Sequence, residues 1–275
     1  MSKTNSDQGV LLQLDGVVSR IGRLEFGPVS LQVVQGERIA ILGPSGAGKS
    51  SLMKFISREC IPDTGQVHFC GRPLSGWSLT ELSQLRAVLP QSGTLAFGLN
   101  VDLVVGLGRV ARAHDPQLTE IVAASAQMAR AYHLLCRRFD TLSGGEQARV
   151  QLARIFAQLW DVQGGLVLVD EPLAALDPGL QFELLDSLDR YATERNHALL
   201  AILHDINQAM FGFDRLLLVK EGKLVGDLAC SPDAVPALAA LYGIGLRCIV
   251  DGLGSVYVVP SRDCPSRPVS AITLP

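Results

Sequence analysis

The chain has 275 residues, of which 48% are hydrophobic and 19% charged, and its formal net charge is −3. A net negative charge gives no general attraction for nucleic acid, so we expect no nucleic acid partner. No apolar run reaches the roughly 18 residues that a membrane helix needs, and Met1–Gly9 lacks the apolar centre of a signal peptide. We therefore expect a cytosolic chain that forms one large domain or two small ones.

Three strands are predicted near the start of the chain. Residues 11–18 alternate weakly between apolar and polar, 29–34 do the same, and 38–42 form a short apolar run. The connections between these strands are too short for crossover helices, so we expect antiparallel pairing in this part. The third strand leads directly into a glycine-rich stretch.

That stretch, Gly43–Ser50, reads GPSGAGKS and is followed by a helical apolar pattern over 52–56. Glycines allow backbone N–H groups to approach phosphate oxygens, and the start of the helix adds its positive dipole end. Lys49 supplies a charge for the outer phosphates, and the Ser50 hydroxyl is placed to bind Mg²⁺. The alternative is a glycine-rich turn with a surface lysine. We predict a nucleoside triphosphate site made of Gly43, Pro44, Ser45, Gly46, Ala47, Gly48, Lys49, Ser50 and Ser51.

Helical spacing dominates the middle of the chain. After a strand at 66–69, a helical turn at 80–86 and a strand at 87–89, apolar residues recur at helical spacing from Pro116 to Arg138. We interpret about 91–160 as a helical insertion.

A second anion-binding pattern follows at Leu142–Glu146. Ser143 and Glu146 match a capping box, and Gly144 and Gly145 leave the first N–H groups of the next helix uncovered. Alone, an ordinary helix cap would be the better interpretation. In a chain with a triphosphate site, the second anion site most simply completes the site of another copy.

Two carboxylates end the apolar strand predicted at 166–169. In an α/β sheet, the carboxyl end of such a strand lies beside the phosphate loop. Asp170 can hold Mg²⁺ through water, and Glu171 is placed to polarise the water that attacks the γ-phosphate. The alternative is an acidic strand end that faces solvent.

The remaining pattern predicts an alternating α/β fold and a small appendix. We expect elements at 178–195 (helix), 198–203 (strand), 206–212 (helix), 215–219 with 223–227 (hairpin), 233–241 (helix) and 246–250 with 256–259 (hairpin). The chain after Pro260 is rich in proline and serine and is predicted to be loose.

Several polar residues are given structural interpretations. The six cysteines, Cys60, Cys70, Cys136, Cys230, Cys248 and Cys264, contain no C-x-x-C pair and are interpreted as reduced and structural, in apparent core and tail. The histidines interpreted in the same way are His68, His114, His133 and His197.

Taken in order, the motifs from about 11 to 227 resemble the nucleotide-binding subunit of an ATP-binding cassette (ABC) transporter. The matching segments are Gly43–Ser50 (Walker A), Gln91 (Q-loop), Leu142–Glu146 (signature, with Glu146 where glutamine is more usual), Leu166–Glu171 (Walker B and catalytic glutamate), Ala175–Pro178 (D-loop) and His204 (switch histidine).

The resemblance implies a fold. It implies the α/β P-loop NTPase fold of an ABC ATPase, with a mixed sheet core, an antiparallel β part and a helical subdomain. We expect one domain over 1–275, with its core at about 11–90 and 161–227 and its helical subdomain at about 91–160. About 228–275 would hold the C-terminal helix, the small hairpin and the loose tail.

The resemblance also implies roles for the motif residues. Two copies would pair head to tail, with ATP between the phosphate loop of one and Ser143, Gly144, Gly145 and Glu146 of the other. Asp177 would touch the opposite subunit, although it also reads as a plain N-cap before Pro178. Glu171 and His204 would be catalytic, Gln91 would join the nucleotide site, and Ser50, Gln91 and Asp170 would hold Mg²⁺.

One departure concerns adenine. The family usually carries an aromatic residue near 18–24 that stacks on the base, whereas this chain has Arg20 and Ile21 there. Either Arg20 stacks its guanidinium plane on the base, or Phe26 reaches it, or base recognition is weak.

Further segments resemble the importer branch that serves haem, ferric siderophores and cobalamin, and look closest to haem importers. They are 85–91, 95–97, 144–154, 203–207 and 241–243. This implies a peripheral subunit on the cytoplasmic face of the inner membrane, bound to integral membrane permease subunits at 95–107 and indirectly to a substrate-binding protein. The alternatives are siderophore or cobalamin import, a non-transport ABC ATPase, and a regulatory pseudo-ATPase.

Overall fold

The computed structural model describes residues 9–22, 24–90, 98–112, 114–170, 176–250 and 256–261. Its main sheet has six strands in the order β10-β9-β3-β8-β7-β6. These strands are β10 (Lys223–Ala229), β9 (Arg215–Lys220), β3 (Arg38–Leu42), β8 (Ala198–Ile202), β7 (Leu166–Asp170) and β6 (Arg86–Leu89). The five strands from β9 to β6 are parallel, and β10 pairs antiparallel with β9. The mixed sheet expected from the sequence is confirmed.

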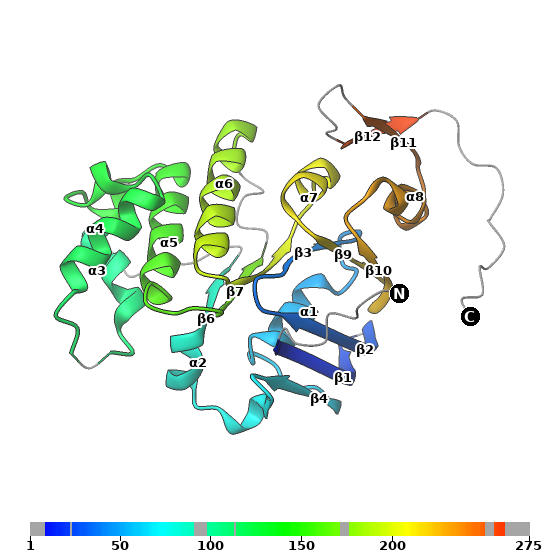
Figure 1. Ribbon diagram of the computed structural model, residues 1–275, viewed down its shortest axis with the longest axis horizontal. Coiled ribbons are helices and arrows are strands. Elements are labelled where there is room, and N and C mark those ends of the chain that lie inside the picture. Colours follow the sequence, from blue (N-terminus) through cyan, green and yellow to red (C-terminus); the bar gives the residue numbers. More distant parts are fainter. Residues whose placement is uncertain are drawn as a thin grey trace, which may run out of the picture.

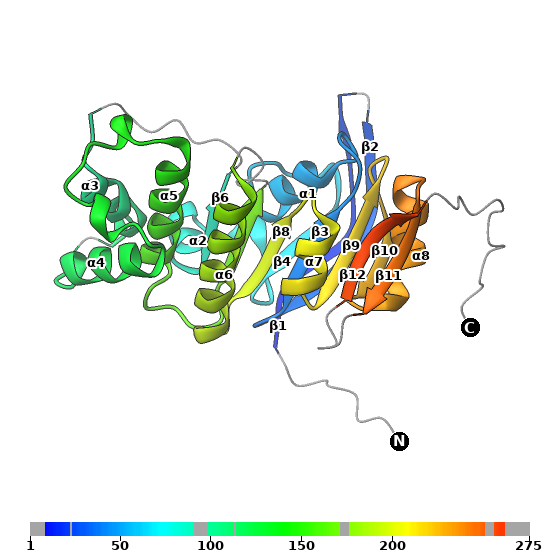
Figure 2. The ribbon, with the colours of Figure 1, turned by 90° about the horizontal axis from the view of Figure 1, so that it is seen from above.

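The central strands are buried on both faces, and this separates two hydrophobic cores. In β3, Ile39 and Ile41 belong to one core, whereas Ala40 and Leu42 belong to the other. The first core contains α1 (Lys49–Ile56) and the antiparallel sheet; the second contains the buried sides of α5 (Gly144–Gln158), α6 (Pro178–Glu194) and α8 (Val235–Tyr242). Alternation along each strand therefore places helices on both sides of the sheet (Figures 1 and 2).

The antiparallel sheet has the order β2-β1-β4-β5. It consists of β1 (Val10–Ile21), β2 (Leu24–Val34), β4 (Thr64–Phe69) and the short β5 (Arg72–Pro73). β1 pairs antiparallel with β2, as their short connection indicates, and also with the distant β4. The expectation was wrong for the third strand: β3 joins the main sheet, where it pairs parallel with β8 and β9. β1 and β2 extend beyond the predicted segments, because register shifts between Leu14 and Ser19 let the ladder continue to Ile21 and Leu24.

The middle of the chain forms the predicted helical part. It contains α3 (Val101–Gly106), α4 (Leu118–Met128) and α5, and it follows α2 (Leu79–Leu85), which begins at a Ser78–Glu81 capping box. The helix expected to run to Arg138 ends at Met128. Arg130 adopts a left-handed conformation with φ 54°, and the Ala131 N–H donates back to the Ala126 carbonyl at 2.7 Å. Short 3₁₀ turns at Tyr132–Leu134 and Phe139–Thr141 then carry the chain to α5.

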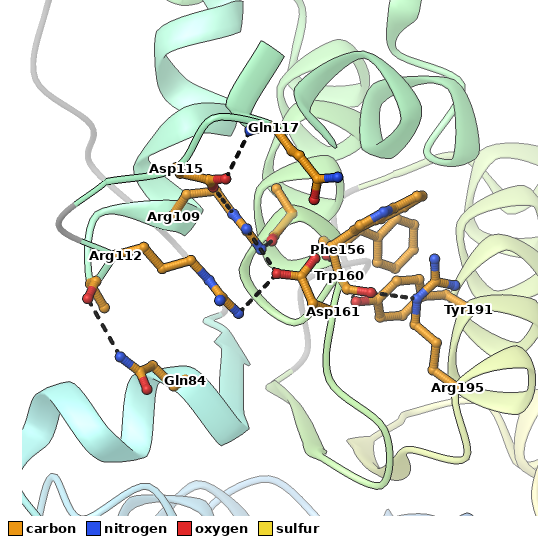
Figure 3. A network of polar contacts seen from close by, with 12 residues as sticks. Gln84, Arg109, Arg112, Asp115, Gln117, Phe156, Trp160, Asp161, Tyr191 and Arg195 are labelled. Atoms are coloured by element: carbon orange, nitrogen blue, oxygen red, sulfur yellow. Dashed lines mark hydrogen bonds and ion pairs between the residues drawn. The ribbon is translucent and has the colours of Figure 1, made fainter. Parts of the chain in front are cut away.

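A buried arginine ties the helical part together. The Arg109 side chain is 3% exposed, forms ion pairs with Asp115 at 2.6 Å and Asp161 at 2.9 Å, and donates to the Ala157 carbonyl at 3.2 Å. Figure 3 shows these groups between the turn after α3 and the end of α5, with Arg112 directed at the same Asp161. Trp160, the residue before Asp161, is covered by Arg195, whose guanidinium carbon lies 4.2 Å from the centroid of the Trp160 ring.

A small hairpin closes the described chain. β11 (Gly245–Val250) and β12 (Val256–Ser261) pair antiparallel and lie beside α7 (Ile206–Gly212) (Figure 2). The Asn207 side-chain amide bonds both backbone groups of Val258. Its Oδ1 accepts the Val258 N–H at 2.7 Å, and its Nδ2 donates to the Val258 carbonyl at 3.1 Å. The predicted hairpin is confirmed, whereas the tail after Ser261 lies outside the described residues.

The burial of individual side chains tests the structural interpretations of the cysteines and of His197. Cys60, Cys70 and Cys136 are exposed free thiols, so their placement in the core was wrong. His197 has the structural role expected of it, since its Nδ1 accepts the Gly165 N–H at 2.9 Å and burial lowers its pKa to about 4. Among the helices of the described ranges, none combines the length and the apolar content needed to cross a membrane.

Candidate nucleotide-binding site

The glycine-rich loop lies between the carboxyl end of β3 and the start of α1, as the sequence predicts. Gly43 passes so close to β9 that a Cβ there would lie 2.1 Å from the Val219 carbonyl oxygen. Gly46 and Gly48 have φ of 75° and 104°, conformations that other residues adopt with strain. The Gly222 N–H donates to the Ala47 carbonyl at 2.8 Å, which ties the loop to the β9–β10 turn. The glycines therefore fix a compact loop whose backbone can approach a ligand.

Lys49 is held inside this loop. The residue is only 4% exposed, and its Nζ donates to the carbonyls of Gly43 at 2.9 Å and Pro44 at 3.1 Å. A surface lysine at a flexible turn would be solvated, so the structure disfavours that alternative for this stretch. The ammonium group is a buried cation at the mouth of a phosphate-binding loop.

Ser50 and Asp170 meet although 120 residues separate them. The Ser50 hydroxyl donates to Oδ1 of Asp170 at 3.2 Å, which joins the first turn of α1 to the end of β7. A hydroxyl and a carboxylate are hard oxygen donors of the kind that Mg²⁺ takes together with water and phosphate oxygens. The two residues thus fit the metal role expected of them.

His204 follows β8 at the same edge of the sheet. Ile41 of β3 and Asp170 of β7 both pair with Ile202, so the phosphate loop, Asp170 and His204 leave the carboxyl ends of three adjacent strands. Asp205 caps α7 through Oδ1, which accepts from the Asn207 N–H at 2.7 Å. His204 is exposed at the start of that helix.

Two predicted site residues, Gln91 and Glu171, lie outside the described residues, as does 95–97. The strands that precede them are described, and β6 pairs with β7 in register at Leu89 and Val169.

The second anion-binding pattern forms the predicted capping box at the start of α5. The Glu146 N–H donates to Ser143 Oγ at 3.3 Å, and Glu146 Oε2 accepts from the Ser143 N–H at 2.8 Å. A Cβ on Gly144 would meet nothing within 4 Å, whereas one on Gly145 would lie 2.4 Å from Leu180 Cδ2. The helix start is therefore open on the Gly144 side and closed against α6 on the Gly145 side.

This helix start does not adjoin the phosphate loop of its own chain. In both views α5 stands apart from α1, with strands of the main sheet between them (Figures 1 and 2). Asp177 caps the neighbouring helix α6: its Oδ1 accepts the Leu180 N–H at 3.0 Å, with Pro178 at the first helical position. The plain N-cap interpretation of Asp177 is confirmed, and the residue is exposed.

Of the three alternatives for adenine recognition, contact between the base and Phe26 does not fit the structure. Phe26 is 1% exposed and packs against Phe55 with ring centroids 5.2 Å apart, beneath the loop. Leu24, which sequence reasoning missed, instead lines a hollow shared with Ser45 through Ser51. Leu24 lies at the end of the region, near 18–24, where the family usually stacks an aromatic residue on adenine, but a leucine has no ring to stack and gives no such signal.

Comparison with known proteins gives a consistent result. The model of the family described as "ABC transporter" matches residues 26–174. A hemin import ATP-binding protein, HmuV, of Pseudomonas putida is 41% identical over 85% of this chain and 93% of its own length. A metal-chelate type ABC transporter in an inward-facing conformation superposes with a TM-score of 0.77 at 21% identity, over 92% of this chain and 98% of the other. A dimeric ATP-binding cassette bound to ADP and phosphate gives a TM-score of 0.70 at 24% identity, over 80% and 99% of the two chains.

Proposed function

Because the chain belongs to the ABC transporter family, we propose that it is the ATP-hydrolysing subunit of an importer and that the imported compound is haem. One observation carries the ATPase part: the 3.2 Å hydrogen bond from Ser50 to Asp170, which joins the loop holding Lys49 to the carboxylate end of β7. The 41% identity to a hemin import ATP-binding protein supports the cargo.

In this proposal, each chain binds one triphosphate at its own loop. Backbone N–H groups of Gly43–Ser51 surround the phosphates, and Lys49, already desolvated, supplies the opposing charge. Ser50 and Asp170, with Gln91 as a further ligand, would hold Mg²⁺, which would supply positive charge to neutralise the phosphates. Glu171 orients and deprotonates the attacking water, and His204 contacts the γ-phosphate.

A second copy of the chain completes each site. The start of α5 lies apart from its own phosphate loop (Figure 1), so its open Gly144 side is available to a nucleotide held by the partner. Ser143, Gly144, Gly145 and Glu146 then act across the interface, and Asp177 contacts the opposite subunit. The dimeric cassette bound to ADP and phosphate supports pairing as a property of this fold.

We also propose the division of the chain and its setting. The nucleotide core is 11–90 with 161–227, the helical subdomain is 91–160, and 228–275 forms the C-terminal appendix. The subunit binds integral membrane permease subunits at the cytoplasmic face of the inner membrane, with the helical subdomain as the docking part. A substrate-binding protein acts on it only through that complex.

The proposal is tested in proteoliposomes that contain the chain, its permease and a substrate-binding protein. We expect haem, and neither a ferric siderophore nor cobalamin, to stimulate ATP hydrolysis, and Glu171→Gln to abolish the stimulated rate. Stimulation by a different compound would contradict haem as the imported compound, but the proposed ATPase role would stand. A hydrolysis rate that no ligand and no permease changes would favour a non-transport ABC ATPase. ATP binding without turnover would favour a pseudo-ATPase.

A further inference from the structure

The signature helix carries a negative charge at the end that the proposed function assigns to a phosphate. Glu146 stands where the family more often has a neutral glutamine, and its Oε2 accepts both the Ser143 N–H, at 2.8 Å, and the Ser143 hydroxyl, at 3.0 Å. The same hydroxyl accepts the Glu146 N–H. Both polar groups of Ser143 that could meet a phosphate are therefore engaged by a carboxylate of the same charge as the phosphate.

Among the described residues, Arg137 is the arginine that pairs with this carboxylate. Arg137 Nη1 lies 2.6 Å from Glu146 Oε1, on the oxygen that Ser143 does not use. The side chains are 46% and 28% exposed, so the pair stands at the open surface of the helix start. The next residue, Arg138, does not share this role, because both of its bonded nitrogens point to Asp140, at 3.1 and 2.7 Å.

We infer that Arg137 is a positioning residue of the interfacial nucleotide site: it neutralises the Glu146 carboxylate so that the partner's ATP can approach the start of α5. This inference rests on the proposed function, in which Ser143 and Gly144 face a nucleotide held by the second copy. The reason is electrostatic. A carboxylate beside a triphosphate repels it, and an arginine bound to that carboxylate cancels most of the repulsion at short range.

A purely structural role for the Arg137–Glu146 pair and the proposed electrostatic role predict different effects of Glu146→Gln on dimer formation. If the Arg137–Glu146 pair only stabilised the fold, Glu146→Gln would weaken the cap and could not improve dimer formation. If the pair tunes the approach of the triphosphate, Glu146→Gln removes the repulsive charge while its amide can still accept from Ser143. ATP-driven dimerisation then becomes tighter.

The experiment measures ATP-driven dimerisation of the full-length chain by sedimentation, in a Glu171→Gln background that blocks hydrolysis. At low salt we expect Arg137→Ala to raise the ATP concentration for half-maximal dimer about three- to fivefold, and Glu146→Gln to lower it by a similar factor. The double variant should match Glu146→Gln alone, because Arg137 then has no charge to offset. Arg138→Ala is the matched control and should leave dimerisation unchanged.

Three results would overturn the inference. One is an Arg137→Ala effect no larger than that of Arg138→Ala. Another is weaker dimerisation in Glu146→Gln. The last is an Arg137→Ala effect of equal size with and without the Glu146→Gln substitution.

Failure of the proposed function looks different. In that case the parent chain itself either does not bind a fluorescent ATP analogue as a monomer or forms no dimer with ATP. Monomer binding should be the same in all the variants, since their changes lie away from the phosphate loop.

Discussion

At the scale of single residues, Lys49 shows how burial gives a side chain its chemistry. Its ammonium group is removed from water and held by two loop carbonyls, so its conformational and solvation costs have been met before a ligand arrives. Such a preorganised cation contributes more to phosphate binding than a mobile surface lysine does.

We therefore expect Lys49→Ala to weaken ATP binding by at least about tenfold, the effect of losing one charge-assisted contact of roughly 1.4 kcal/mol or more. Lys54→Ala is the matched control, because Lys54 lies on the same helix but is exposed in its last turn. Titration with a fluorescent ATP analogue measures both. Equal affinities for the two variants would contradict the assignment of Lys49.

Residue-scale prediction of structure succeeded where the structure depends on local spacing. The phosphate loop, the capping box at Ser143 and the N-cap at Asp177 involve neighbours within a few residues, and each was readable from the chain. The possibility that Phe26 reaches the base stayed open at the sequence level, because the burial of Phe26 depends on Phe55, which lies on another element. Side-chain partners distant in sequence leave no local signal.

At the scale of elements, the Arg109 cluster fixes the join between the turn after α3 and the end of α5 (Figure 3). Arg109 lowers the pKa of Asp115 below its usual range, mainly through their hydrogen bond. The Asp115 side chain is only 9% exposed, so removal of the guanidinium would leave its charge with the Gln117 N–H, at 3.2 Å, and without its ion-pair partner.

We expect Arg109→Met to lower the free energy of unfolding by about 3 kcal/mol at neutral pH, as for other buried pairs that lose one partner. The stabilisation by Asp115 is present above its unfolded pKa and is lost as pH falls through the lower folded pKa, so the difference from wild type should shrink in acid. Urea unfolding at several pH values measures this. A difference that does not change with pH would argue against the ion pair as its source.

The helical subdomain also shows why element boundaries were harder to predict than elements. Apolar spacing continued through 116–138, yet the helix ends where Arg130 turns into a left-handed conformation usually taken by glycine or asparagine. The Ala131 N–H closes this turn by donating to the Ala126 carbonyl, and the Arg130 side chain forms ion pairs with Glu183 and Asp186 of α6. Apolar periodicity records neither the left-handed turn nor these contacts, so it does not mark the end of the helix.

At the scale of the whole molecule, the main sheet is a wall shared by two cores. Alternate residues of β3, β7 and β8 pack into opposite cores, so neither core can lose its packing without exposing the back of strands needed by the other. The sequence predicted the strands and their double burial. It could not provide the order β3-β8-β7, because strands with similar apolar composition are interchangeable until helices of definite length connect them.

We expect the ligand-free chain to unfold in one cooperative transition. In calorimetry the van't Hoff and calorimetric enthalpies should then agree. Two resolved transitions, with the antiparallel sheet lost separately from the α5–α6 side, would show that the shared strands do not couple the cores.

The Asn207 amide beside β12 has a consequence for solubility. An outer strand of a two-stranded hairpin presents free N–H and C=O groups that can recruit a strand from another molecule, which is a route to aggregation. Asn207 occupies both groups of Val258, as a neighbouring strand would, and Phe211 covers Tyr257 next to it. At Val258, one helix side chain thus takes the place of a third strand and satisfies the two groups that could otherwise pair with another molecule.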